Sequence, residues 1–328
     1  MGTRGYILKK VFQAFLTLLA VIVFNFFLFR ILPADPVDIL TRGAGAKLDD
    51  AEKAELRASY GLDQPLFPGQ FMDFMGDTLR GDLGQSIIQR PGEDVTAIFG
   101  EFMWPTLLLV GVSTLVSTVL GIFMGIYGGW RRNGKFDLFS MGFSLVLYSM
   151  PEFWLGMLLI LLFSTTLGWF PSSGRATVGA GYTGMTAVAD IVNHLFLPAL
   201  TLTLAYLGEY YLVMRSSLLD VLGEDYITTA RAKGVREKWV LRRHAVRNAL
   251  LPTITLIALS FGFVLGGAIT VEVVFGYKGL GGLTYEALQN RDFPLLQGIF
   301  LISSATVIGM NLVADLIYGY FDPRVREA

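Results

Sequence analysis

The stretch that decides the fold is Phe102–Trp130, which reads FMWPTLLLVGVSTLVSTVLGIFMGIYGGW and contains no charged residue. A helix crosses a hydrocarbon core of about 30 Å with roughly 20 apolar residues, because each residue adds about 1.5 Å of length. Lipid offers no partner for open backbone N–H and C=O groups. The run therefore predicts a transmembrane helix.

The same stretch carries Gly121, Gly125 and Gly129 at intervals of four, and Gly262 with Gly266 repeats this spacing later in the chain. Small residues at this interval form a flat strip against which another helix backbone packs closely. Two interpretations stay open, namely packing inside one helix bundle and a moving or intersubunit interface.

Five further runs of low charge have the length of a span. They are Val11–Phe29, Leu138–Leu167 (interrupted by Pro151 and Glu152), Leu195–Val213 (with Glu209 near one end), Leu250–Val271 and Leu295–Ala314 (followed by Asp315). The first run exceeds the apolar part of a signal peptide and no A-x-A site follows it, so we expect a retained anchor. The sequence thus predicts an all-α integral membrane protein with six transmembrane helices.

The composition agrees with this class. Of 328 residues, 53% are hydrophobic and only 16% are charged, whereas soluble domains average about 25% charged. The chain has no cysteine and two histidines, His194 and His244, so disulfides and thiolate metal sites are excluded and no bound metal is expected. A net charge of −1 gives no sign of a nucleic-acid partner.

Lysine and arginine predict the orientation, because cytoplasmic loops retain them. Most of the 26 basic residues fall in four short segments: Arg4, Lys9 and Lys10; Arg131, Arg132 and Lys135; Arg215 to Arg247; Arg324 and Arg326. With these segments inside, both termini are cytoplasmic, membrane lipid surrounds the spans, and residues 31–100 form an extracytoplasmic insert. We expect the insert to hold a capped helix at Asp49–Tyr60 and a second helix at Gln70–Arg80.

Two candidate sites lie on the spans and their first cytoplasmic turn. A charge inside lipid costs roughly 2.5 to 3.5 kcal/mol, so Glu152, which follows Pro151, is expected to face the bundle or a wet cavity. Its role there is either that of a static hydrogen-bonding group or that of part of a path.

Gly129–Phe136 imitates a phosphate-binding loop, but Phe136 replaces the hydroxyl that would hold Mg²⁺. The chain is therefore not expected to be an ATPase or another enzyme.

The cytoplasmic segment 215–250 is too long for a simple turn. It offers two helical stretches, Asp225–Lys233 and Val235–Asn248, around Gly234, which permits the positive φ of a tight turn. Composition alone leaves two other interpretations open, an amphipathic helix on lipid headgroups and a basic loop that only sets topology.

Here the residues resemble a known family. Asp225-Tyr-Ile-Thr-Thr-Ala-Arg-Ala-Lys-Gly234 and His244-Ala-Val-Arg-Asn-Ala-Leu-Leu-Pro252 are similar to the coupling loop of binding-protein-dependent ABC permeases. The general Glu-Ala-Ala pattern is partly kept: Thr228 and Thr229 replace its first two residues, and Pro252 comes later than usual. This longer spacing resembles the oligopeptide and dipeptide (and nickel) import branch.

Further fragments resemble the first permease subunit of that branch, which carries a large insert after its first helix. They are Ile31–Pro36, Tyr60–Leu66, Leu79–Gly84, Pro151–Gly156, Val271–Gly281, Arg291–Pro294 and Asp315–Arg326. Their order and spacing cover almost the whole chain. The resemblance implies a type I importer permease (MetI-like) bundle, with a transmembrane helix at 1–30, the insert at 31–100, the permease domain at 101–322 and a cytoplasmic tail at 323–328.

The resemblance also implies partners and site residues. The expected partners are a second homologous permease, two ATP-binding subunits (or a homodimer of one) and an extracytoplasmic substrate-binding protein. The expected location is a bacterial inner membrane. ATP and Mg are expected to bind to the partner subunits, and this chain is expected to bind no cofactor. The ATPase-coupling residues are Asp225, Tyr226, Ala230, Arg231, Ala232, Lys233 and Gly234, supported by His244, Arg247, Asn248 and Pro252. Glu152 is the candidate path-lining residue.

The substrate implied is a di- or oligopeptide, and relatives that take nickel chelates, sugars or opines keep those alternatives open. An ion-coupled secondary transporter is a rival, but it usually has paired broken helices, and the span interrupted at Pro151 has no matching partner. An intramembrane hydrolase would need a nucleophile beside a base. His194 and His244 are expected on opposite sides of the membrane, which leaves no credible pair.

Overall fold

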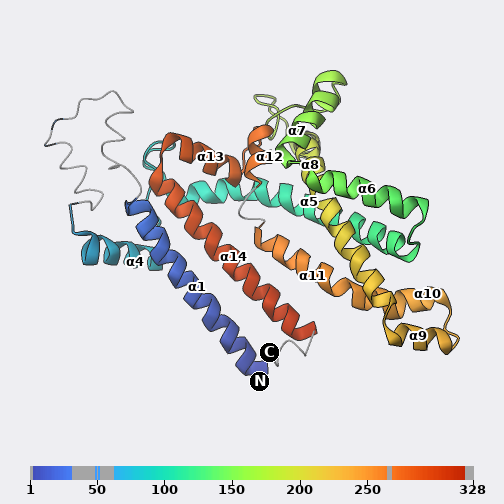
Figure 1. Cartoon of the computed structure of the whole chain (residues 1–328). Coiled ribbons are helices and arrows are strands. Elements are labelled where there is room, and N and C mark those ends of the chain that lie inside the picture. Colours follow the sequence, from blue (N-terminus) through green and yellow to red (C-terminus); the bar gives the residue numbers. More distant parts are fainter. Residues whose placement is uncertain (1–2, 32–48, 50, 52–62, 264–267, 322–328) are drawn as a thin grey trace. The chain divides into compact units, whose positions relative to one another are not determined.

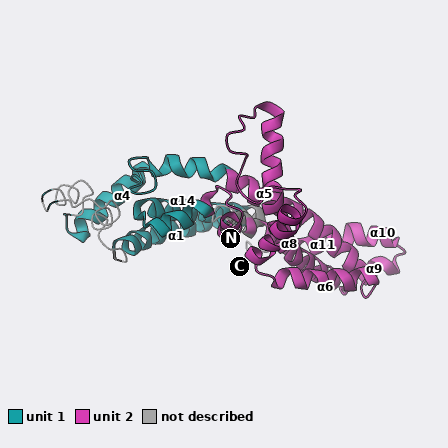
Figure 2. Cartoon of the chain, turned by 90° about the horizontal axis from the view of Figure 1, so that it is seen from above, with its two compact units in different colours: residues 1–104, 282–328 teal, residues 105–281 magenta. Residues whose placement is uncertain are grey.

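The computed structural model describes residues 3–31, 49, 51, 63–263 and 268–321. These residues form helices joined by turns, and the β-structure within them is a single bridge between Gln85 and Asp94. Two compact units arise, residues 1–104 with 282–328 and residues 105–281, coloured separately in Figure 2. The predicted helix Asp49–Tyr60, the tail 323–328 and the spacing of Gly262 with Gly266 lie outside the described residues or side chains.

In the first unit, the helix near each end of the chain runs beside the other. Figure 1 shows α1 (Thr3–Ile31) packed along α14 (Phe293–Phe321). Lys10 Nζ lies 3.0 Å from an Asp315 carboxylate oxygen, and Asn25 donates to the Gln297 carbonyl at 3.3 Å. Polar contacts at two levels therefore help to set the alignment of these two largely apolar helices.

The first unit contains a short helix where the sequence predicts one, at Gln70–Arg80. The irregular turn η1 (Leu66–Gln70) leads into α4 (Phe71–Arg80), which ends at Gly81 because that residue adopts φ +81°. Phe71 and Phe74 pack against Phe26 of α1, with ring centroids 5.2 and 5.3 Å apart. Aromatic burial thus holds α4 to α1.

The second unit is arranged around one long helix, α8 (Gly184–Leu222). The helices α6 (Lys135–Ser149), α7 (Glu152–Leu159) and α11 (Val246–Phe263) all pack against α8. Helix α5 (Val95–Trp130) starts in the first unit and enters the second at Pro105. The remaining elements of this unit are η2 (Ile160–Thr166), α9 (Asp225–Ala232), α10 (Glu237–Trp239), η3 (Val240–Ala245) and α12 (Ile269–Val274). Helix α13 (Leu280–Asn290) belongs to the first unit from Gly282 onward.

The glycine strip of α5 packs on α8. A Cβ added at Gly121 would stand 2.5 Å from the Tyr210 Cβ, and one at Gly129 would stand 3.1 Å from a Leu218 methyl carbon. The first of these contacts is closer than real side chains approach one another. The interpretation as packing inside one bundle is therefore confirmed for this strip.

Four described helices are long and apolar enough to cross a membrane: Gly5–Arg30, Val95–Trp130, Met185–Leu222 and Phe293–Val313. The predicted third span is not straight, since Lys135–Ser149 and Glu152–Thr166 meet at 105°. Met150 is extended there (φ −80°, ψ 133°), because the residue before a proline is driven out of the helical region. Counted as one broken span, this pair makes five.

Two predicted spans differ from the structure at their ends. The fourth, Leu195–Val213, is part of α8, which is longer at both ends. At its C-terminal end, Arg215 is paired with Asp137 inside the unit and does not stop the helix. The fifth, Leu250–Val271, covers most of α11 and the start of α12, but residues 264–267 between them are not described. The count of six spans therefore stays a prediction.

Candidate functional site

The turn predicted at Gly234 is confirmed. Gly234 has φ +75°, and its N–H donates to the Arg231 carbonyl at 2.9 Å while the Val235 N–H reaches the Ala230 carbonyl at 3.2 Å. Helix α9 ends here with the left-handed residue that closes many helices. Among the described residues, no atom lies within 4 Å of a Cβ built on Gly234, so backbone conformation and not space favours glycine there.

One face of α9 is buried in a small core shared with three other elements. Ile227 and Ala230 pack with Met214 and Leu218 of α8 and with Val240 of η3. Partly buried residues of α5 complete this cluster, namely Ile122, Ile126 and Trp130. The position of α9 is therefore tied by apolar packing to the ends of α5 and α8 and to the start of α11.

The other face of α9 is exposed and polar. Tyr226, Arg231 and Lys233 lie on it, together with Asp225 and Ala232. Arg231 makes an ion pair with Glu237 of α10, with Nε 3.0 Å from Oε1. This pair joins α9 to the helix that follows the turn, while leaving the rest of the polar face open.

The four supporting residues predicted downstream are only partly brought to α9. Asn248 donates to the Tyr226 hydroxyl at 2.8 Å. His244 lies half-buried on η3, and Arg247 and Pro252 lie on α11. Within the described chain, no hydrogen bond or ion pair joins these three to α9.

Sequence reasoning missed a buried ionic cluster near the same end of the second unit. Asp137, in the first turn of α6, has 1% of its surface exposed and accepts from both Nε and Nη2 of Arg215 in α8, at 2.5 and 2.8 Å. The Tyr211 hydroxyl donates to the same carboxylate at 3.1 Å. The only sequence signal is an acid at the start of an apolar helix, since its side-chain partners Tyr211 and Arg215 are more than seventy residues away.

Glu152 opens α7 directly after the break at Pro151. Its side chain is partly buried, and its Oε2 accepts from the Thr270 hydroxyl of α12 at 3.5 Å, the long limit of a hydrogen bond. The carboxylate therefore faces another helix of the second unit, as expected for an acid in a span.

A second buried acid of this unit, Glu272, has no exposed surface. Thr106 Oγ1 donates to Glu272 Oε1 at 2.7 Å and accepts from the Leu280 N–H at 2.8 Å. A Cβ on Gly279 would stand 2.5 Å from Glu272 Oε2, so only glycine fits beside this carboxylate. Burial also raises the pKa of the nearby Tyr277 hydroxyl to about 12.

In the first unit, Asp292 holds residues 86–89 against the start of α14. Its buried carboxylate accepts from the Ser86 hydroxyl at 2.6 Å and from the backbone N–H groups of Ile87, Ile88 and Gln89 at 3.0 to 3.2 Å. Arg90 follows this loop and pairs with Glu101, and the hydrogen bond to Glu101 raises the Arg90 pKa above its usual value.

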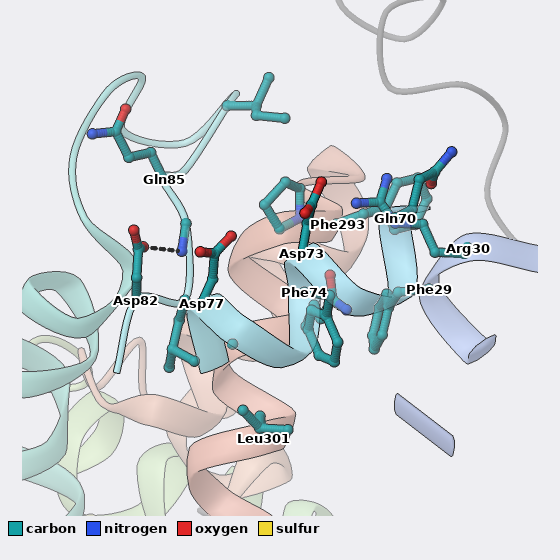
Figure 3. Close-up of a pocket in the computed structure, with 16 residues that line it drawn as sticks. Phe29, Arg30, Gln70, Asp73, Phe74, Asp77, Asp82, Gln85, Phe293 and Leu301 are labelled. Carbon is teal, nitrogen blue, oxygen red and sulfur yellow. Dashed lines mark hydrogen bonds between the residues drawn. The ribbon is translucent and has the colours of Figure 1, made fainter. Parts of the chain in front are cut away.

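A pocket of about 420 Å³ lies in the first unit between the end of α1, α4, the loop 82–87 and the start of α14. Figure 3 shows Arg30 on one side and the carboxylates of Asp77 and Asp82 on neighbouring segments, with Phe29 and Phe74 between. Asp82 accepts from the Gly84 N–H at 2.9 Å. The pocket thus combines one cation, exposed carboxylates and aromatic rings.

None of these clusters is a metal centre by composition. Among the residues that the structure describes, no group of three or more His, Cys, Asp or Glu side chains is arranged to hold a metal ion.

Comparison with known proteins gives two family matches along the chain. Residues 117–327 match the family described as binding-protein-dependent transport system inner membrane component, and residues 4–92 match the N-terminal region of such membrane components. The two matches together span nearly the whole sequence.

Individual relatives are similar over the full length. A protein of Brucella suis named as a peptide permease is 38% identical, over 98% of each chain. The oligopeptide transport system permease protein of Bacillus subtilis is 34% identical, and the glutathione transport system permease protein of Escherichia coli is 39% identical, each over 98% of this chain and 99% of its own.

A solved structure has the same fold. The inward-facing methionine ABC transporter MetNI contains a chain that superposes with a TM-score of 0.53 at 17% identity, covering 69% of this chain and 97% of that one. At this identity the likeness establishes the arrangement of the helices alone.

Proposed function

The chain belongs to the family of binding-protein-dependent transport system inner membrane components and is a permease subunit of an ABC importer. On this premise we propose that it carries di- or oligopeptides and docks an ATP-hydrolysing subunit through α9. The relatives named for peptide, oligopeptide and glutathione transport support the substrate class, since glutathione is itself a modified tripeptide. A nickel chelate, a sugar or an opine is the alternative cargo.

The observation that carries the docking role is the two-sided character of α9. Its inner face is fastened to the ends of α5 and α8 by Ile227 and Ala230, and its outer face is exposed and polar. A helix that is fixed on one side and open on the other can transmit a push from a separate protein to the spans. A helix that only covered lipid headgroups would instead present an apolar outer face.

The assembly that we propose follows from this geometry and from the family. This permease pairs with a second homologous permease, each offers one docking helix to a pair of ATP-binding subunits, and an extracytoplasmic binding protein delivers the substrate. ATP and Mg²⁺ are bound by the partner subunits. In this arrangement α9 and both termini face the cytoplasm, in the inner membrane of a bacterium, and residues 31–100 face outward.

The docking role is tested by the backbone at Gly234. A β-branched residue resists a φ of +75° at a cost of about 1 to 3 kcal/mol, so Gly234→Val should misaim the end of α9 and abolish binding-protein-stimulated ATP hydrolysis in the reconstituted four-subunit core. Asn tolerates this conformation better, and Gly234→Asn should retain stimulation. Arg231→Glu should weaken it less than Gly234→Val, because an exposed pair contributes under about 1 kcal/mol.

Gly81→Val is the matched control, since Gly81 has φ +81° but lies at the end of α4 in the other unit. It should leave ATPase retention and stimulation unchanged. Full ATPase retention with normal transport in Gly234→Val would reject the docking role and leave the membrane-surface interpretation of the loop.

The substrate class is tested with the same proteoliposomes. Di- to pentapeptides, a nickel chelate, an opine and a disaccharide are added with the binding protein, and stimulation of ATP hydrolysis is measured for each. We expect stimulation by peptides alone. Stimulation by one of the other compounds, with peptides inactive, would assign the alternative cargo.

We also propose that Glu152 lines the translocation path. Its partial burial and its long hydrogen bond to Thr270 leave the carboxylate free to exchange partners as the helices move. Glu152→Leu should preserve insertion and change transport, whereas Thr270→Val should change transport less. Unaltered transport and stability in Glu152→Leu would remove this residue from the path.

A further inference from the structure

The buried cluster around Asp137 joins two helices, α6 and α8, and the turn between α5 and α6. Each carboxylate oxygen of Asp137 accepts two hydrogen bonds. Oδ1 accepts from Arg215 Nε and the Tyr211 hydroxyl, and Oδ2 accepts from Arg215 Nη2 and the Asn133 N–H. Arg215 and Tyr211 belong to α8, Asp137 belongs to α6, and Asn133 lies in the turn between α5 and α6.

The backbone around the cluster is shaped to admit it. Asn133 adopts φ +62°, a left-handed conformation that directs its N–H into the carboxylate. Gly128 of α5 leaves the remaining space, since a Cβ there would stand 2.9 Å from the Tyr211 hydroxyl and 3.2 Å from Asp137 Oδ1. A residue with a side chain at Gly128 would therefore press on both partners of the cluster.

The cluster lies directly beside the core that holds α9. Met214 and Leu218, on either side of Arg215 along α8, pack in one apolar cluster with Ile227 and Ala230 of α9. Helix α8 continues only to Leu222 before α9 begins at Asp225. Because Met214 and Leu218 flank Arg215 along the chain, a displacement of α9 would move the part of α8 that carries Arg215.

Stability alone is a poor reason for a buried ion pair. Desolvation of two charges offsets most of their attraction, and well-packed apolar residues often stabilise a protein as much. What a guanidinium adds is two parallel hydrogen bonds in a fixed plane, which resist both rotation and sliding between the helices that carry them. Apolar contacts between α6 and α8 alone would permit such movement more readily.

We propose that Asp137 and Arg215 form a positioning joint that makes α6, α8 and the α5–α6 turn move as one body when α9 is displaced, so that ATP hydrolysis is converted into transport. This inference rests on the proposed docking role of α9. It assigns to Asp137 a part in coupling and not in contact with substrate or nucleotide.

The first test is the number of substrate molecules imported per ATP hydrolysed by the reconstituted complex. Asp137→Asn keeps the size of the side chain but removes the charge, and Arg215→Lys keeps the charge but loses the two-pronged geometry. We expect both variants to assemble and to hydrolyse ATP, with the transport ratio lowered by about tenfold, within the range of coupling effects of single residues. Asp315→Asn, which breaks the Lys10–Asp315 ion pair of the other unit, should leave the ratio unchanged.

An unchanged ratio in Asp137→Asn and Arg215→Lys would overturn the proposal. So would loss of the assembled complex in both variants, because the pair would then only hold the fold. A proportional fall of ATP hydrolysis and transport, with the ratio preserved, would count against the joint in the same way.

The second test follows the joint itself and needs no ATPase. Because the chain has no cysteine, spin labels can be placed by Phe139→Cys on α6 and Lys238→Cys on α10, both exposed, and their distance distribution measured in detergent. We expect a narrow distribution in the otherwise unchanged chain and a broad one with Asp137→Asn. Equal widths would overturn the joint, whereas a failed docking test at Gly234 would overturn only the role of α9.

Discussion

Gly125 of α5 and Met214 of α8 approach so closely that a Cβ added to the glycine would stand 2.7 Å from the Met214 Cβ. Neither residue could be moved without moving its helix, because the Tyr211 carbonyl lies 3.0 Å from the same point. Met214 belongs to the apolar core that holds α9, and the next residue, Arg215, belongs to the ionic cluster of Asp137, so the spacing of α5 and α8 affects both.

Gly125→Ala should therefore lower stability by about 1 to 3 kcal/mol, since the added methyl group forces two packed helices apart. The measurement is the thermal unfolding midpoint in detergent. Gly111→Ala is the matched control, because Gly111 lies in the same helix and a Cβ added there would meet no described atom within 4 Å. Equal midpoints for the two variants would contradict the close approach.

Asp292→Asn should loosen the loop 86–89 from the start of α14. The Asn NH₂ group would face hydroxyl and N–H donors that now bind the carboxylate. Each buried donor left without an acceptor lowers the stability by about 1 to 3 kcal/mol. We expect faster tryptic cleavage after Arg80. Asp82→Asn, where one exposed bond to Gly84 is altered, should cleave at the rate of the unmodified protein.

Thr106→Val should destabilise the second unit although it preserves the shape of the side chain. It deletes a donor to Glu272 and an acceptor for the Leu280 N–H, and each hydrogen bond lost lowers stability by about 0.5 to 1.5 kcal/mol. Thr201→Val is the control, because the Thr201 hydroxyl donates to the Leu197 carbonyl of its own helix. A loss of stability no larger than that of Thr201→Val would show that the hydroxyl of Thr106 does not support Glu272.

The orientation of the chain can be tested directly because it lacks cysteine. Single substitutions Arg80→Cys and Lys238→Cys place thiols on exposed positions of α4 and α10. A maleimide that does not cross membranes should label position 80 in intact cells and position 238 only after lysis, with Arg132→Cys behaving like position 238. Labelling of position 238 from outside would reverse the proposed topology.

The sequence by itself determined the class of protein and much of its local structure. Long uncharged runs can exist in lipid only as helices, so the spans at Phe102–Trp130 and Val11–Phe29 followed from length alone. The sequence predicts a left-handed turn at Gly234 because glycine has no Cβ to clash, and the structure confirms φ +75°. The strip from Gly121 to Gly129 was recognised for the same reason, as a surface that admits another backbone.

The tertiary structure alone decided which polar residues meet. Asp137 and Arg215 are 78 positions apart and Ser86 and Asp292 are 206 apart, and no periodicity in the sequence relates such distant groups. The 105° bend after Met150 likewise exceeds what Pro151 requires. Proline only removes one hydrogen-bond donor and displaces the preceding residue from the helical region. The size of the angle depends on how α6 and α7 each pack on α8. Local chemistry selects helices and breaks, but the pairing of buried charges is selected by desolvation, which acts only once the helices have come together.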